Sequence, residues 1–206
     1  MKVLLINGSP HREGCTFTAL SEVARTLEQN GIESEIFYIG TQPVANCIAC
    51  RKCRATGQCA FDDAVNKIGA RLDEFDALVL GSPVYYAGPS GQIGSFCDRL
   101  FFSHARKMAG KLGAAVVSCR RGGATAAFDR LNKYFTIANM QVVGSQYWNM
   151  VHGSAPQEVR KDEEGLQTMR TLAQNMAWLL KCIELGKKNG IHKPEYEPVT
   201  PTNFIR

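Results

Sequence analysis

The chain has 206 residues, of which 45% are hydrophobic and 21% charged, and this composition excludes a disordered, collagen-like or low-complexity protein. The net charge of +5 comes from 24 basic and 19 acidic residues without a strong basic cluster, so it does not predict a nucleic-acid partner. We expect a cytoplasmic protein, because no apolar run is long enough for a membrane span and the apolar residues after Met1 are too few for a signal peptide.

Short apolar runs alternate with amphipathic segments, which is typical of an α/β fold. The predicted strands cover Lys2–Asn7, Glu33–Tyr38, Ala77–Gly81, Ala114–Cys119 and Gln141–Gly144. Several are continuous runs of Val, Leu and Ile, which indicates a parallel sheet buried on both faces. The predicted helices cover Thr16–Gln29, Asp62–Glu74, Gly91–Arg106, Gly122–Asn139 and Glu163–Leu185. We therefore expect a flavodoxin-like, doubly wound sheet of five strands in the order 2-1-3-4-5, with helices on both faces.

Two segments interrupt this alternation. Residues 40–61 form a long connection that carries four cysteines, and connections of this length are usually functional. The tail over residues 190–206 contains three prolines, which prevent a regular helix. The expected organisation is therefore one domain over residues 1–189, followed by an extended arm that lies on this subunit or on a neighbour.

The first candidate binding element lies between the first strand and the first helix. It reads Gly8-Ser9-Pro10-His11-Arg12-Glu13-Gly14-Cys15-Thr16. A turn at this place directs backbone N–H groups and the positive end of the helix dipole toward one point, which suits a phosphate. The loop has neither the Lys-Ser/Thr pair of a P-loop nor the pattern of a dinucleotide turn. It therefore predicts a tightly held monophosphate, with an ordinary strand-to-helix turn as the alternative.

Two further elements follow the third and fourth predicted strands. In the segment from Gly81 to Gly91, Tyr85 and Tyr86 offer flat ring faces to a heterocycle, unless they pack in the core or against another subunit. The segment Ser118–Ala124 offers backbone N–H groups and a guanidinium to the carbonyl edge of the same heterocycle. Strands 1, 3 and 4 are neighbours in the predicted order, so the three elements should line one crevice.

These elements together resemble the NADPH-dependent FMN reductase family of flavodoxin-like proteins, over roughly residues 1–185. The residues that carry the resemblance are the Gly8–Thr16 loop, Gly81-Ser82-Pro83-Val84-Tyr85, Asp98-Arg99 and the Arg-Gly-Gly turn at 121–123. The resemblance implies bound FMN, NAD(P)H as hydride donor, and a homodimer or homotetramer. It assigns FMN to Ser9, His11, Gly14, Cys15, Thr16, Pro83, Val84, Tyr85, Tyr86, Ser118, Arg120, Arg121, Gly122 and Gly123. His11 and Cys15 depart from the family pattern, which usually has a basic residue and Asn at these positions.

Half of the cysteines are concentrated in the long connection, at Cys47, Cys50, Cys53 and Cys59. Four thiolates at this close spacing can hold a compact [4Fe–4S] cluster. Structural zinc usually separates its two ligand pairs by a longer stretch, so an iron–sulfur cluster is the better metal hypothesis. The spacing resembles that of the iron-sulfur flavoprotein branch of the same family. Free or redox-active thiols remain the main alternative, and zinc a weaker one.

The remaining candidates have structural interpretations. His104, His152 and His192 have no partner at catalytic spacing, so surface or packing roles are expected. Asp62 and Asp63 predict a helix cap, with Asp62 at the start of the helix. Core or interface positions are predicted for Trp148 and Trp178. A subunit interface is also predicted on the helix Gly91–Arg106, from its apolar residues Phe96, Leu100, Phe101 and Phe102.

The sequence thus predicts an FMN-dependent oxidoreductase that passes electrons from NAD(P)H to a quinone or another small acceptor. Because the flavin carries the chemistry, no catalytic acid or base is expected among the side chains. The alternative is an electron carrier that holds FMN and a [4Fe–4S] cluster and is reduced by a ferredoxin. A redox sensor that uses the thiols of residues 47–59 is a third hypothesis.

Overall fold

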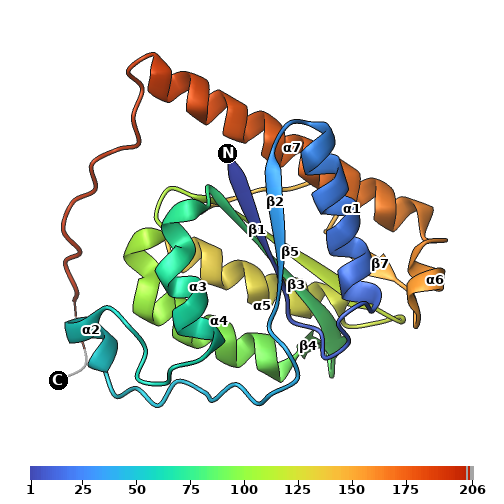
Figure 1. Cartoon of the computed structure of the whole chain (residues 1–206), viewed down its shortest axis with the longest axis horizontal. Helices are drawn as coiled ribbons and strands as arrows, with labels where there is room; N and C mark the ends of the chain where they lie inside the picture. The colour runs from blue at the N-terminus through green and yellow to red at the C-terminus, as the bar shows by residue number, and fades with distance from the viewer. Residues whose placement is uncertain (203, 205–206) are drawn as a thin grey trace.

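The computed structural model describes residues 1–202 and 204, and its parallel sheet carries helices on both faces (Figure 1). The sheet runs in the order β2-β1-β3-β5-β6, with the bounds Glu33–Tyr38, Lys2–Asn7, Ala77–Tyr85, Leu112–Cys119 and Gln141–Val142. The far end of β5 pairs with β7 (Met150–His152) instead of β6. This is the predicted flavodoxin-like order, with the fifth strand divided into two short strands.

The central strands are buried because helices cover both of their faces. All eight residues of β5 are buried, as are five of the six residues of β1, which explains their continuous apolar sequences. Strand β3 continues to Tyr85, four residues beyond its predicted end, because β4 (Gly88–Pro89) folds back and pairs with it. The polar loops that follow β1, β3 and β5 therefore project from one edge of a rigid sheet.

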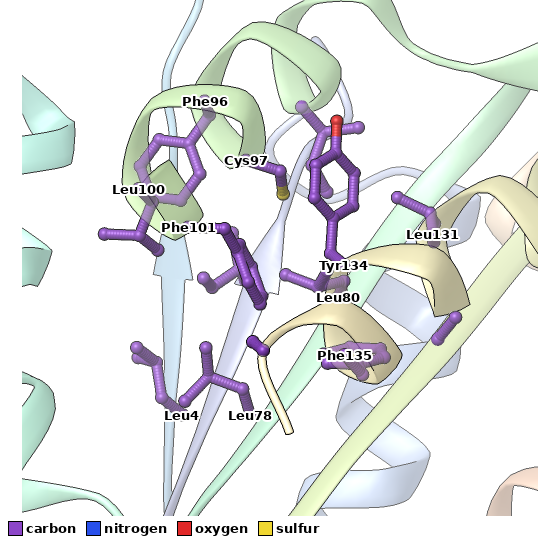
Figure 2. Close-up of a cluster of buried hydrophobic side chains, with 14 of the residues drawn as sticks. Leu4, Leu78, Leu80, Phe96, Cys97, Leu100, Phe101, Leu131, Tyr134 and Phe135 are labelled. Atoms are coloured by element: carbon purple, nitrogen blue, oxygen red, sulfur yellow. The ribbon is translucent and has the colours of Figure 1, made fainter. Parts of the chain in front are cut away.

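Two hydrophobic cores flank the sheet. One lies under α1 (Cys15–Gln29) and α7 (Glu163–Lys188), and the other under α3 (Ala64–Arg71), α4 (Gly91–His104) and α5 (Ala124–Ile137). Figure 2 shows the second core, in which side chains of α4 and α5 meet the leucines of β1 and β3. These helices are fixed to the sheet by apolar burial and not by their intrinsic propensity alone.

The subunit interface predicted on α4 is wrong for three of its four residues. Phe96 and Leu100 are fully buried in this chain's own core, and the ring of Phe101 packs 5.2 Å from that of Tyr134. Among the four predicted residues, only Phe102 is exposed. The helix is apolar because it contacts the sheet on one side and the cysteine-containing connection on the other.

The predicted helices are present, with ends that differ by up to three residues; the last one continues through Gly186 to Lys188 and does not end at Leu185. The second predicted helix is capped by Asp63 and not by Asp62: the Asp63 carboxylate accepts the backbone N–H of Val65 at 3.0 Å. This helix ends earlier than predicted and continues as a 3-10 turn, η1 (Leu72–Glu74), and α4 likewise continues as η2 (Ala105–Lys107). Two short helices were not predicted, α2 (Lys52–Thr56) and α6 (Pro156–Val159).

The segments outside the alternation are exposed. Apart from α2, the connection over residues 40–61 has no helix or strand, and neither have the described residues that follow Gly190. Trp148 and Trp178 are both exposed, so the predicted core position is wrong for each. His104 has the predicted packing role, since its buried ring lies 2.6 Å from the Ser103 hydroxyl. Within the described part of the chain, no helix has the length and apolar character needed to cross a membrane.

Candidate functional site

The site lies where β1, β3 and β5 end at the same edge of the sheet. The register aligns Asn7 with Gly81 and Pro83 with Ser118, so the loops after the three strands emerge next to one another. In open α/β sheets, ligands bind in the crevice beyond these carboxyl ends. The topology therefore brings together the three elements that the sequence analysis singled out.

Buried Asn7 shapes the first loop. Its side-chain oxygen accepts the Ser9 N–H at 3.1 Å, and its amide donates to the carbonyl of Arg12 at 3.0 Å. The loop is also held from β2, whose Tyr38 hydroxyl donates to the Pro10 carbonyl at 2.8 Å. Sequence reasoning assigned no role to Asn7, although a polar residue at the end of a fully apolar strand was a signal that could have found it.

The first loop presents hydrogen-bond donors to the crevice. The Ser9 oxygen accepts the His11 N–H at 3.1 Å, which leaves the hydroxyl hydrogen of Ser9 free to donate. Thr16 and Ser118 share one hydrogen bond of 2.9 Å, so one of these two hydroxyls also keeps a hydrogen to donate. Gly14 caps α1 without a side-chain cap, and the N–H groups of the first helical turn therefore point outward. Such a group of donors suits a phosphate.

The two residues that depart from the family pattern lie differently. His11 is exposed at the tip of the loop. The Cys15 thiol donates to the carbonyl of Gly153 at 3.6 Å, so this side chain has a partner on the β7 side of the site. Burial raises the pKa of Cys15, which keeps the thiol protonated and uncharged at neutral pH. At Cys15, the backbone N–H is therefore a better phosphate donor than the side chain.

Two serines join the second loop to the first. The Ser90 hydroxyl donates to the Gly8 carbonyl at 2.7 Å, and the Ser90 N–H donates to the Ser82 hydroxyl at 2.9 Å. Pro83 and Val84, which follow Ser82, are half-buried. Tyr85 is exposed, and Tyr86 is fully exposed. The core position considered for the two tyrosines is therefore wrong, and their rings are accessible to a flat ligand.

The third loop packs directly against the second. A Cβ atom placed on Gly123 would lie 2.8 Å from the Cα of Ala87 and 3.2 Å from Cγ1 of Val84. Arg120, Arg121 and Gly122 are exposed beside this contact. A cleft opens on the other side of the turn, and Arg121, Trp148 and His152 are among the residues that line it. The second and third loops thus form one wall, with a cleft beside it that could admit a second ligand.

The contact at Gly123 gives a test of this wall. Gly123→Ala would introduce a side chain at φ +86° and against Ala87, and we expect a loss of about 2 kcal/mol or more in the free energy of unfolding. A ligand that binds against this wall should lose affinity about tenfold or more, since a loss of about 1.4 kcal/mol in the free energy of binding is a factor of ten. Denaturant titration measures the first effect, and titration with FMN, the ligand that the sequence predicts, measures the second. The matched control is Gly122→Ala, where nothing lies within 4 Å of the added carbon; equal behaviour of the two variants would contradict the role of this contact.

The four clustered cysteines form a second centre. Cys47, Cys50, Cys53 and Cys59 all line one small cavity, together with Phe61, Arg99 and Phe102. Over residues 1–202 and 204, no three His, Cys, Asp or Glu side chains converge closely enough to hold a single metal ion. Four cysteine residues around one cavity are the kind of donor set that a [4Fe–4S] cluster uses.

One face of α4 holds this cysteine-containing connection in place. Gln92 donates to the carbonyl of Gly40 at 2.5 Å, and Ser95 is hydrogen-bonded to Asn46. One turn further along, Arg99 forms an ion pair with Asp63, with Nη1 and Oδ2 2.6 Å apart. The sequence analysis named Arg99 only as part of a motif, because its partners are distant in sequence.

Comparison with known proteins finds one matching family and several similar flavoproteins. A family model described as NADPH-dependent FMN reductase matches residues 1–155. An iron-sulfur flavoprotein of Methanocaldococcus jannaschii is 33% identical over 194 residues, which cover 89% of this chain and 100% of that protein. An iron-sulfur flavoprotein of Methanosarcina thermophila is 26% identical over 191 residues, covering 91% of this chain and 99% of that protein.

Solved structures show the same fold at lower identity. The structure of RosB with bound 8-demethyl-8-formylriboflavin-5'-phosphate has a TM-score of 0.70 and 13% identity, and the match covers 100% of this chain and 93% of that one. At this identity the likeness concerns the fold alone.

Proposed function

Because the chain belongs to the NADPH-dependent FMN reductase family, we propose that it is a flavin oxidoreductase that binds FMN, takes electrons from NAD(P)H and passes them to a quinone or another small acceptor. The observation that carries this proposal is the convergence of three loops, after β1, β3 and β5, on one crevice. The first loop offers hydroxyl and backbone donors, Ser118 in β5 adds a hydroxyl, and the loops after β3 and β5 pack against each other.

The residues of the site have separate tasks. Bound FMN would supply the chemistry of hydride acceptance and electron release. The hydroxyl of Ser9, the free hydroxyl hydrogen of the pair Thr16 and Ser118, and the first turn of α1 would bind its phosphate. Tyr85 and Tyr86 would lie along the ring, and N–H groups of the turn before Gly123 would donate to its carbonyl edge. Arg121, which lines the cleft beside this turn, would attract an anionic dinucleotide.

A second candidate function is favoured by the cysteine cavity. In it, the chain is an electron carrier that holds a [4Fe–4S] cluster on Cys47, Cys50, Cys53 and Cys59 besides FMN, and a ferredoxin reduces it. Two observations support this candidate. The four cysteine residues line one cavity, and the relatives named above are iron-sulfur flavoproteins that this chain matches over nearly their whole length. In this candidate the four thiolates would bind iron.

One preparation separates the two candidates. The protein is purified without oxygen and analysed for flavin, iron and acid-labile sulfide, and then mixed in separate samples with NADH, NADPH or reduced ferredoxin. About one FMN and no iron per chain, with flavin bleaching within seconds by a nicotinamide, supports the reductase. About four irons per chain, with reduction by ferredoxin and not by nicotinamide, supports the carrier. A chain that binds no flavin under these conditions would contradict both.

A further inference from the structure

Arg99 is the most completely buried charged side chain in the described part of the structure, and the flavin site does not use it. It is 1% exposed although it carries a charge, and a buried charge is costly unless it is paired and hydrogen-bonded. Its position on α4, nine residues after the cap residue Ser90, puts it beside the cysteine cavity. Its partners therefore indicate what the burial achieves.

All five N–H donors of the Arg99 guanidinium have an acceptor. Nη1 and Nη2 donate to the two carboxylate oxygens of Asp63, at 2.6 and 2.9 Å. Nη1 also donates to the carbonyl of Ala45 at 3.3 Å, and Nη2 to the carbonyl of Phe61 at 3.1 Å. The fifth donor, Nε, donates to the sulfur of Cys59 at 3.1 Å. The Phe61 ring lies 4.9 Å from the guanidinium carbon, which adds a cation–π contact.

These acceptors lie on both sides of the cysteine motif. Ala45 precedes Cys47, the first of the four cysteines, by two residues. Cys59 is the last of the four, and Phe61 and Asp63 lie between it and the start of α3. One side chain therefore closes the two ends of the segment that carries all four sulfurs. The fork geometry of arginine is required for this, because lysine has three donors on one nitrogen and cannot reach five acceptors in a plane.

The hydrogen bond to Cys59 has a chemical consequence beyond position. Donors aimed at the sulfurs of an iron–sulfur cluster, and the partners that orient its ligands, help to set its reduction potential and metal affinity. If a cluster were bound here, its reduction would add negative charge at the sulfur ligands, and a donor that keeps its proton would favour the reduced form. Arg99 keeps its proton at all accessible pH values.

We propose that Arg99 is a positioning residue of the cluster site, which closes the cysteine segment over residues 45–63 and raises the reduction potential by donating Nε–H to Cys59. This inference rests on the second candidate function above, in which the four cysteines bind a [4Fe–4S] cluster.

The test compares Arg99→Lys with a matched control, Arg130→Lys. Arg130 forms an exposed ion pair at 3.2 Å with Asp98, the residue that precedes Arg99 in the sequence, and it also donates to the Tyr134 hydroxyl. Neither of these partners belongs to the cysteine segment. In the iron-loaded protein, Arg99→Lys should release iron to a chelator about 10- to 100-fold faster than the wild type. Its cluster should have a more negative midpoint potential in an EPR-monitored titration, while FMN content is unchanged. Arg130→Lys should match the wild type in all three measurements.

A second measurement does not depend on the cluster. Trypsin should cleave the iron-free Arg99→Lys protein at the exposed residues Arg51, Lys52 and Arg54 about tenfold faster than the iron-free wild type. This result supports the closure even if the variant retains no iron for a potential measurement.

The outcomes separate the inference from the function on which it rests. An iron-containing wild type, with Arg99→Lys unchanged in iron release, potential and cleavage, overturns the inference alone. A wild type that takes up no iron under anaerobic reconstitution overturns the cluster function and with it a role of Arg99 at a cluster.

Discussion

Removing the hydroxyls of Ser9 and Thr16 should abolish tight flavin binding. A hydrogen bond to a charged group is worth about 1.5–3 kcal/mol, so Ser9→Ala and Thr16→Val should each weaken FMN binding by about 10- to 150-fold. The double variant should be purified without its yellow colour. Quenching of FMN fluorescence on titration with apoprotein measures the dissociation constants. Valine keeps the shape of threonine, so the packing of the buried Thr16 is retained.

Riboflavin is the decisive control, because it lacks the phosphate. If the hydroxyls bind the phosphate, both variants should bind riboflavin as well as the wild type does, and the preference for FMN over riboflavin should disappear. Thr26→Val, a buried threonine on the same helix but ten residues further along, should leave both affinities unchanged. Equal losses for FMN and riboflavin would instead indicate a damaged crevice and contradict the assignment of the phosphate.

If the chain holds the cluster of the second candidate function, replacing the four clustered cysteines should remove iron and leave the flavin. Serine at Cys47, Cys50, Cys53 and Cys59 together should reduce iron from about four atoms per chain to a trace. Even a single replacement at Cys59, whose sulfur accepts from Arg99, should lower iron content strongly. Iron and sulfide analysis of anaerobically reconstituted protein, with the visible spectrum, measures the effect. FMN content should not change, because none of the residues proposed to bind FMN lies in the cysteine-containing connection over residues 40–61.

The control for this series is Cys182→Ser. Cys182 is an exposed free cysteine on α7, outside the cysteine cavity, and its replacement should leave iron and flavin unchanged. If the quadruple variant keeps its iron, the cluster is not held by these sulfurs. If alkylation of the four thiols changes a response of the protein while iron is absent from the wild type, the redox-sensor hypothesis is favoured instead.

The sheet could be predicted from sequence because its central strands, β1, β3 and β5, contain continuous apolar runs. The predicted bounds Lys2–Asn7 and Glu33–Tyr38 are also the observed ones, although the second segment begins with polar residues, and the strand order follows from the alternation of strands with helices. Local patterns could not reveal the division of the fifth strand into β6 and β7, since strands of two or three residues carry no period. Nor could they show that α4 is covered on two sides, which is why its aromatic residues resemble an interface.

The site was predictable only in part for a similar reason. The three flavin loops are short, and each follows a strand, so their positions follow from the topology. The role of Arg99 depends on partners 36 to 54 residues away, in a segment without regular structure. A sequence pattern within one helix does not show such contacts, although an arginine surrounded by Phe96 and Leu100 was a sign of a buried, paired charge.

Ser90 caps helix α4 and joins the first two loops of the flavin site, and Arg99, nine residues further along, closes the cysteine segment. Nine residues of helix advance about 14 Å along the axis and turn through 2.5 revolutions. One continuous helix therefore fixes the distance between the residue that joins the flavin loops and the residue that closes the cysteine segment. A single residue gained or lost between Ser90 and Arg99 would move one of these side chains by about 1.5 Å along the axis and about 100° around it relative to the other.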